Sequence, residues 1–109
     1  MTHRNTWKNF ERVVAKDFGA SGRTPLSGGN SGHTRSDTLH PRLFIECKLR
    51  ARFAPCRTYD EAAELADKED KVPLVALKEK GRAGYYLILR PEDLPRICDE
   101  WQAAQEVTA

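Results

Sequence analysis

Apolar side chains recur at three- and four-residue steps near both ends of the chain. The first stripe consists of Trp7, Phe10, Val14 and Phe18. The second consists of Leu94, Ile97, Cys98 and Trp101. This spacing places each stripe on one side of a helix. It predicts one amphipathic helix over residues 5–18 and another that begins at Pro91, since proline is favoured at the first helical position.

Between these helices, shorter apolar runs predict β-strands at residues 36–40, 42–49, 74–77 and 85–89. Residues 23–26 are also expected to be extended, because the residue before Pro25 avoids the helical region. Thr58 and Glu61 form a capping box, which predicts a helix over residues 59–70. The order α-β-β-β-α-β-β-α predicts an α/β fold, with a mixed sheet flanked by helices in a single domain over residues 1–109.

In the run at residues 42–49, side chains should alternate between the two faces of the strand. One face takes Leu43, Ile45, Cys47 and Leu49. The other takes Phe44, Glu46, Lys48 and Arg50. The second face therefore brings a carboxylate and an ammonium group into a half-buried position, which is unusual for a strand that serves only the core.

Asp37 lies shortly upstream, on the predicted neighbouring strand. Two carboxylates and a lysine at the edge of a sheet can bind a divalent cation and activate a water molecule, as metal-dependent phosphodiesterases require. The alternative is an edge strand decorated with charges. A second Glu-x-Lys triplet, at residues 69–71, has no apolar strand around it, and we expect it to be a solvated surface.

Glu11 lies within the apolar stripe of the first helix, about 40° from Trp7 at 100° per residue. An unpaired carboxylate is costly to bury, so Glu11 must meet a cation or hydrogen-bond donors. Two alternatives follow. Glu11 either forms a buried ion pair with an arginine or belongs to an acidic group beside a metal ion.

Charge is distributed unevenly along the chain. Residues 1–57 have a net charge of +7 and residues 58–109 have −5. A basic half that contains the candidate carboxylates favours a polyanionic partner such as nucleic acid, although an uneven solvated surface would give the same count. No apolar run approaches membrane-spanning length. Residues 27–35 lack the Gly-Lys-Ser/Thr ending of a nucleotide-binding loop, so we expect no nucleotide cofactor.

The three cysteines are odd in number and form no CxxC pair. They indicate reduced thiols, and we expect a cytoplasmic protein, in the host cytoplasm if a phage encodes it.

Four segments together resemble the PD-(D/E)XK nuclease superfamily. They are Glu11 in a first helix, Arg23-x-Pro-x-Ser-Gly-Gly, Ser36-Asp37 and Ile45-Glu46-Cys47-Lys48. The compact size and the serine-bearing glycine loop are most similar to archaeal and phage Holliday junction resolvases. The resemblance implies a restriction-endonuclease-like fold, a homodimer, and cleavage of branched DNA that depends on Mg²⁺, with Mn²⁺ as a substitute. Ser36 departs from the usual proline before the aspartate.

The resemblance also implies roles for individual residues. The metal would be bound by Asp37, Glu46 and the backbone carbonyl of Cys47, and Glu11 would complete the acidic cluster. Lys48 would orient or activate the attacking water. Ser27 would lie in the loop that contacts the DNA strand. Flanking phosphates would be contacted by Arg23, Arg35, Arg50 and Arg52. Two alternatives remain: a nuclease of the same fold that acts on linear or nicked DNA, and a non-catalytic nucleic-acid-binding module.

Overall fold

The computed structural model describes residues 3–22, 34–49 and 54–108. Their elements, in chain order, are α1 (His3–Asp17), β1 (Leu43–Leu49), α2 (Pro55–Lys68), β2 (Val72–Lys78), β3 (Tyr86–Ile88), the 3₁₀ helix η2 (Pro91–Asp93) and α3 (Leu94–Thr108). Among these residues, none of the helices has the length and apolar character that crossing a membrane requires.

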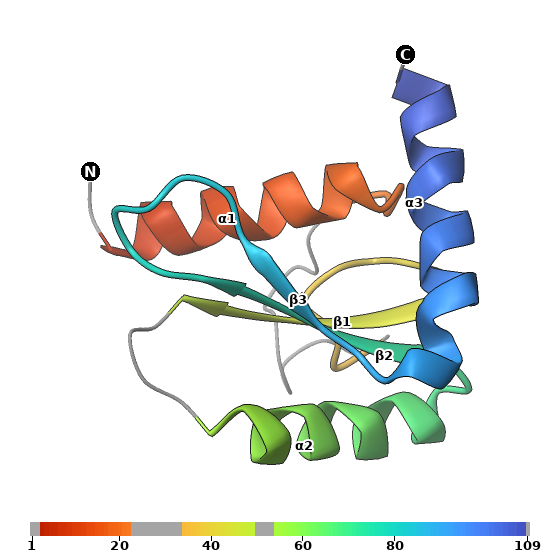
Figure 1. The fold of residues 1–109 in the computed structure, drawn as a ribbon. Helices are drawn as coiled ribbons and strands as arrows, with labels where there is room; N and C mark the ends of the chain where they lie inside the picture. The colour runs from red at the N-terminus through yellow and green to blue at the C-terminus, as the bar shows by residue number, and fades with distance from the viewer. Residues whose placement is uncertain (1–2, 23–33, 50–53, 109) are drawn as a thin grey trace.

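The three strands form one mixed sheet in the order β1-β2-β3. β1 and β2 are parallel and are joined through α2, whereas β2 and β3 are antiparallel. A parallel pair needs such a crossover connection. Figure 1 shows α1 above the sheet, α2 below it, and α3 along one side. The predicted α/β class, with a mixed sheet flanked by helices, is confirmed.

Side chains of β1 alternate between two hydrophobic clusters. Leu43, Ile45 and Cys47 are fully buried in the cluster that includes the apolar stripe of α1. Phe44 is fully buried in the other cluster, against Tyr59 and further residues of α2. The predicted alternation is therefore confirmed for these four residues, and Glu46 and Lys48 follow Phe44 on the α2 side of the sheet.

The first helix is confirmed, and Gly19 ends it with a φ of +74°. The start of the middle helix was predicted wrongly. α2 begins at Pro55, with Ala54 as N-cap, and the Thr58 amide donates to the Ala54 carbonyl at 2.9 Å. Proline at the first helical position sets the start one turn earlier than the capping box does, so Thr58 lies inside the helix.

The predicted strand at residues 36–40 is also wrong, because this segment contains only an isolated bridge at Thr38 and bends. The strands predicted at 74–77 and 85–89 are confirmed as β2 and β3, with a turn between them at Gly81 and Gly84, whose φ values are positive. Residues 23–26 lie outside the described residues.

The apolar stripe predicted for the C-terminal helix is only partly correct. Ile97 is buried, but Leu94 and Trp101 are 47% and 38% exposed, and Cys98 is also exposed. The residue that joins Ile97 in the buried face of α3 is Ala104. A 3₁₀ turn at η2 precedes α3, which therefore starts at Leu94 rather than at Pro91.

Candidate functional site

The outer edge of β1 is the place where the candidate residues meet. The Val72 amide donates to the Arg42 carbonyl at 2.9 Å, which begins the ladder between β1 and β2. In a parallel ladder, alternate residues of a strand bond to the same neighbour. The backbone groups of Ile45 and Cys47 therefore face away from β2, toward the free edge.

Residues 36 and 37 cover this edge. The Ser36 hydroxyl accepts from the Ile45 amide at 2.9 Å and donates to the Ile45 carbonyl at 3.1 Å. The Asp37 amide donates to the same carbonyl at 3.0 Å. Ser36 thus supplies with its side chain what a neighbouring strand would supply with its backbone, which explains why an irregular segment can satisfy the edge of β1. A proline at this position could not make these side-chain bonds.

Asp37 lies directly against the strand. Its side-chain oxygen Oδ2 accepts a hydrogen bond from the Cys47 amide at 2.8 Å, and the residue is only 5% exposed. This bond fixes the Asp37 carboxylate beside the triplet at residues 46–48. By the same alternation, the carbonyl of Cys47 opens toward this edge, so it is available as an oxygen ligand.

Burial and nearby carboxylates raise the pKa of two carboxyl groups at this edge, Asp37 and Glu46. Burial, and then the charge of Glu46, raise the pKa of Asp37 from 3.8 to about 8, and the charge of Glu11 adds to the effect. Burial is also the main cause that raises the pKa of Glu46, and Glu11 and Glu61 contribute to it. Burial and neighbouring carboxylates therefore disfavour the charged forms of Asp37 and Glu46.

Lys48 is the nearby cation. Its Nζ lies 3.5 Å from Oε2 of Glu46, and both side chains are about one quarter exposed. They line a hollow of about 210 Å³ between β1 and α2, together with Arg35 and the α2 residues Thr58, Glu61, Ala62 and Leu65. The ammonium group lowers the pKa of Glu46 but does not outweigh burial.

Glu11 is fully buried, as its place in the apolar stripe predicted. The Trp7 indole Nε1 donates to Oε2 of Glu11 at 2.9 Å. This donor belongs to neither of the two predicted alternatives, an arginine or a metal ion. The signal was present in the sequence, because residues four apart on a helix are neighbours.

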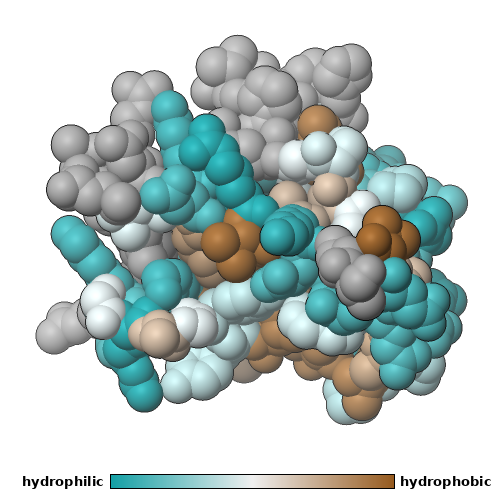
Figure 2. All heavy atoms as spheres, turned by 90° about the horizontal axis from the view of Figure 1, so that it is seen from above, coloured by the Kyte–Doolittle hydropathy of each residue, from teal (hydrophilic) through white to brown (hydrophobic). Residues whose placement is uncertain are grey.

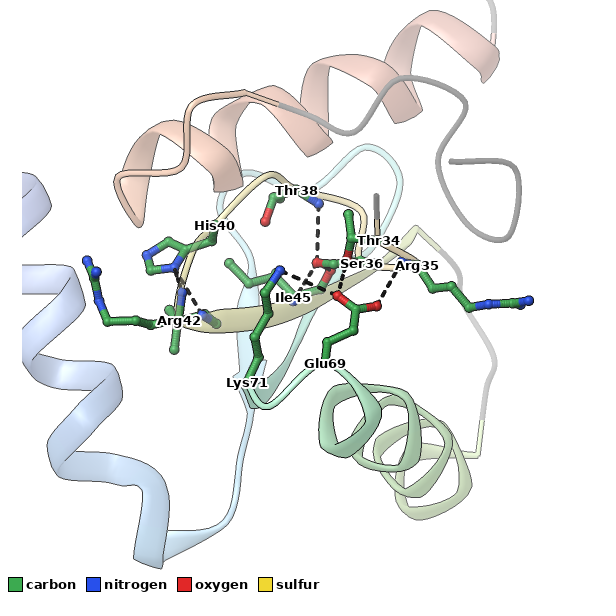
Figure 3. Close-up of polar contacts among 10 residues, drawn as sticks. Thr34, Arg35, Ser36, Thr38, His40, Arg42, Ile45, Glu69 and Lys71 are labelled. Atoms are coloured by element: carbon green, nitrogen blue, oxygen red, sulfur yellow. Dashed lines mark hydrogen bonds and ion pairs between the residues drawn. The ribbon is translucent and has the colours of Figure 1, made fainter. Parts of the chain in front are cut away.

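A second carboxylate, Glu69, holds the segment that carries Asp37 (Figure 3). Its Oε1 accepts from the Thr34 hydroxyl, and its Oε2 accepts from the Arg35 amide at 3.0 Å. Thr34 Oγ1 in turn accepts from the Ser36 amide at 3.0 Å. The prediction that residues 69–71 are merely a solvated surface is therefore wrong.

These hydrogen bonds explain the electrostatics of Glu69. Burial alone would raise its pKa, but the donors from Arg35, Thr34 and Lys71 together hold the pKa below its usual value. The position follows from the end of α2, where Asp70 adopts a positive φ of 54° and the Lys71 amide returns to the Ala66 carbonyl at 3.0 Å. That turn directs Glu69 toward residues 34 and 35.

The donor set suits a hard divalent cation. Mg²⁺ is bound in proteins through one or two carboxylates and retains several waters, and Asp37, Glu46 and the Cys47 carbonyl offer oxygen ligands of this kind. The pKa values of Asp37 and Glu46 are raised first by burial and further by nearby carboxylates, and a bound cation would favour the charged forms. Within residues 3–22, 34–49 and 54–108, no group of three or more His, Cys, Asp or Glu side chains is arranged to hold a metal ion.

Of the candidate DNA-binding residues, Arg35 is exposed, and in Figure 3 its side chain extends away from Glu69. The remaining candidates, Arg23, Ser27, Arg50 and Arg52, lie outside the described residues. Comparison of the chain with protein-family models, with curated proteins and with solved structures finds no match.

Proposed function

We propose that this chain is a metal-dependent endonuclease of the PD-(D/E)XK type, with a restriction-endonuclease-like fold, that hydrolyses DNA phosphodiesters. The observation that carries the proposal is the hydrogen bond from the Cys47 amide to Asp37. It fixes one buried carboxylate next to the strand residues Glu46 and Lys48, although Asp37 lies on a separate, irregular segment.

In this proposal Asp37, Glu46 and the carbonyl of Cys47 would hold Mg²⁺, or Mn²⁺ in its place. A bound cation would neutralise charge on the phosphate and make a water molecule more acidic. The charge of Glu11, which acts on Asp37 and Glu46, would strengthen the attraction for a cation. Lys48, whose ammonium group already pairs with Glu46, orients the attacking water or the scissile phosphate.

Cleavage is hydrolytic: the water oxygen forms a bond to phosphorus as the bond to the leaving 3′ oxygen breaks. Arg35, at the rim of the 210 Å³ hollow, is placed to contact a neighbouring phosphate. We propose branched DNA as the substrate and a homodimer as the acting form, in the cytoplasm. The resemblance described above supports both, since two active sites can cut the two strands that meet at a junction.

A cleavage assay with Mg²⁺ tests this function, using a four-way junction, a fork, a nicked duplex and a linear duplex. We expect the wild-type protein to cleave the junction fastest. Asp37→Asn should lower the rate by at least about 100-fold, because it removes a buried charge that the reaction needs. DNA binding should persist, since a negative charge near phosphate is also removed.

Asp99→Asn is the matched control, because Asp99 is an exposed aspartate of α3. It should cleave at the wild-type rate. Preference for linear or nicked duplex would replace the branched substrate but keep the nuclease. Full activity of Asp37→Asn, or DNA binding by the wild-type protein without cleavage of any substrate, would contradict the proposed chemistry.

A further inference from the structure

Three basic residues follow one line along α1. Lys8, Arg12 and Lys16 are spaced four residues apart, and a residue four positions on lies one turn further along the same side of a helix. We call these three residues the α1 ridge. At a rise of 1.5 Å per residue, neighbouring members are about 6 Å apart along the axis, and the whole ridge extends about 12 Å.

The side chains of the α1 ridge reach solvent. Arg12 and Lys16 are exposed and Lys8 is partly exposed. Across the described ranges of the chain, no carboxylate forms a salt bridge with any of the three. Arg12 Nη1 instead donates a hydrogen bond to the neutral Oδ1 of Asn9, at 3.4 Å.

The carboxylates of the same helix are engaged elsewhere. Glu11 is buried and accepts from Trp7, while Asp17 accepts from the Tyr85 hydroxyl at 2.7 Å. Like charges four residues apart destabilise a helix. Their accumulation on one line is therefore unfavourable for α1 alone and becomes favourable when an anion lies across them.

The ridge lies on the same helix as Glu11. Around the helix, its three members lie about 60° to 140° from Glu11, the α1 residue whose charge acts on Asp37. Arg12 and Lys16 then border a hollow of about 500 Å³ between α1 and α3. Figure 2 views this side of the molecule from above, and hydrophilic side chains cover much of it, with small hydrophobic patches between them.

The opposite side of the molecule carries the opposite charge. On α2, which covers the other face of the sheet, the exposed carboxylates are Asp60, Glu61, Glu64 and Asp67. The exposed cations of α2 are Arg57 and Lys68. The exposed charges of α2 therefore attract a polyanion less than the α1 ridge does.

We infer that the α1 ridge binds the sugar-phosphate backbone of duplex DNA flanking the bond that is cut. The inference rests on the proposed function for the identity of the polyanion. The ridge has three cations, so it can contact up to about three phosphates of one strand in succession. Such contacts position the duplex and carry no sequence preference.

The experiment measures binding of labelled linear duplex and four-way junction over a range of salt concentrations, in EDTA so that no cleavage occurs. The ridge variant combines Lys8→Gln, Arg12→Gln and Lys16→Gln. Each lost phosphate contact should lower the slope of log K against log salt concentration by about 0.9, so the variant should lose about 2 to 3 units. Gln and Lys have similar helix propensity, and the melting temperature checks that the fold is kept.

The control variant combines Lys68→Gln, Lys80→Gln and Arg96→Gln. Like the ridge variant, it removes two lysines and one arginine. These lie at exposed positions on α2, on the turn after β2 and on α3. The control should keep the wild-type slope, because its residues do not lie together. Lys8→Arg with Lys16→Arg should keep it as well, since the charges remain.

Several outcomes would overturn the inference. They are an unchanged slope in the ridge variant, an equal loss of slope in the control, or equally strong binding to phosphatidylserine vesicles that the ridge variant abolishes. The test is independent of catalysis. If Asp37→Asn still cleaves while the ridge variant loses slope, the catalytic proposal fails and the DNA surface stands.

Discussion

The chain contains two Glu-x-Lys triplets that look alike in sequence and in local geometry. Nζ of Lys48 lies 3.5 Å from Glu46, and Nζ of Lys71 lies 3.4 Å from Glu69. The two glutamate side chains are 23% and 19% exposed. Yet the pKa of Glu46 is raised and the pKa of Glu69 is lowered.

The difference lies in what surrounds each carboxylate beyond its lysine. Glu69 accepts from a hydroxyl and a backbone amide, which favour its charged form. For Glu46, burial and the charges of Glu11 and Glu61 disfavour the charged form and outweigh the attraction of Lys48. A carboxylate satisfied by donors stabilises the fold. A carboxylate held near other carboxylates costs stability, and a bound cation would recover that cost.

The largest expected effect comes from Glu46→Gln. We expect cleavage in Mg²⁺ to fall by at least about 100-fold, because a charge that the reaction requires is lost. We also expect the melting temperature in EDTA to stay the same or rise. The folded-state pKa of Glu46 is raised, so its charged form opposes folding at neutral pH, and glutamine removes that charge.

Glu79→Gln is the control for this variant, because Glu79 also pairs with a basic residue, Arg82 at 3.6 Å, but is about half exposed. Both activity and melting temperature should stay at wild-type values. A clear loss of stability in Glu46→Gln with normal cleavage would contradict this prediction. It would mean that Glu46, like Glu69, stabilises the fold.

Some of this site could be predicted from the sequence. Strand alternation is local, so the opposite faces of Phe44 and Ile45 were predicted correctly, as was the burial of Glu11 from helical periodicity. The start of α2 was missed because two valid signals, Pro55 at N1 and Thr58 at N-cap, compete within one turn, and tertiary structure decides between them.

The role of Glu69 could not be predicted from local sequence patterns. Its contacts with Thr34 and Arg35 join residues about 35 positions apart, and they exist only because the turn after α2 returns to the edge of β1. Likewise, nothing in residues 36–40 distinguishes a strand from an irregular segment whose Ser36 hydroxyl replaces a backbone ladder. Both features arise from long-range packing.

The second-largest effect is expected for Glu69→Gln. An amide can accept at one oxygen only, so at least one donor from Thr34 or Arg35 is left unpaired. Hydrogen bonds to charged groups contribute about 1.5–3 kcal/mol, and we expect a loss of unfolding free energy of this order in urea titrations. Cleavage should decrease much less than in Glu46→Gln.

The pH dependence of this loss is a sharper measurement. Because its folded-state pKa is lowered, Glu69 stabilises the protein fully above its unfolded pKa of about 4.5, and this contribution disappears as pH falls through the lower folded value. The stability difference between wild type and Glu69→Gln should therefore shrink below pH 4.5. Glu92→Gln, at an exposed glutamate that pairs with Arg90, should show a smaller difference, because water screens an exposed ion pair. A constant difference for Glu69→Gln would contradict the assignment.

The smallest effect is expected at Thr34, which links Glu69 to the Asp37 segment. Thr34→Val keeps the shape but removes the hydroxyl that donates to Glu69 and accepts from the Ser36 amide. We expect a loss of about 1 kcal/mol, and faster hydrogen exchange at the Cys47 amide, which is protected by Asp37. Thr34→Ser keeps the hydroxyl and should retain that protection. If Thr34→Val exchanges at Cys47 as slowly as the wild type does, Asp37 is held at the strand without help from Glu69, and the second triplet has no influence on the first.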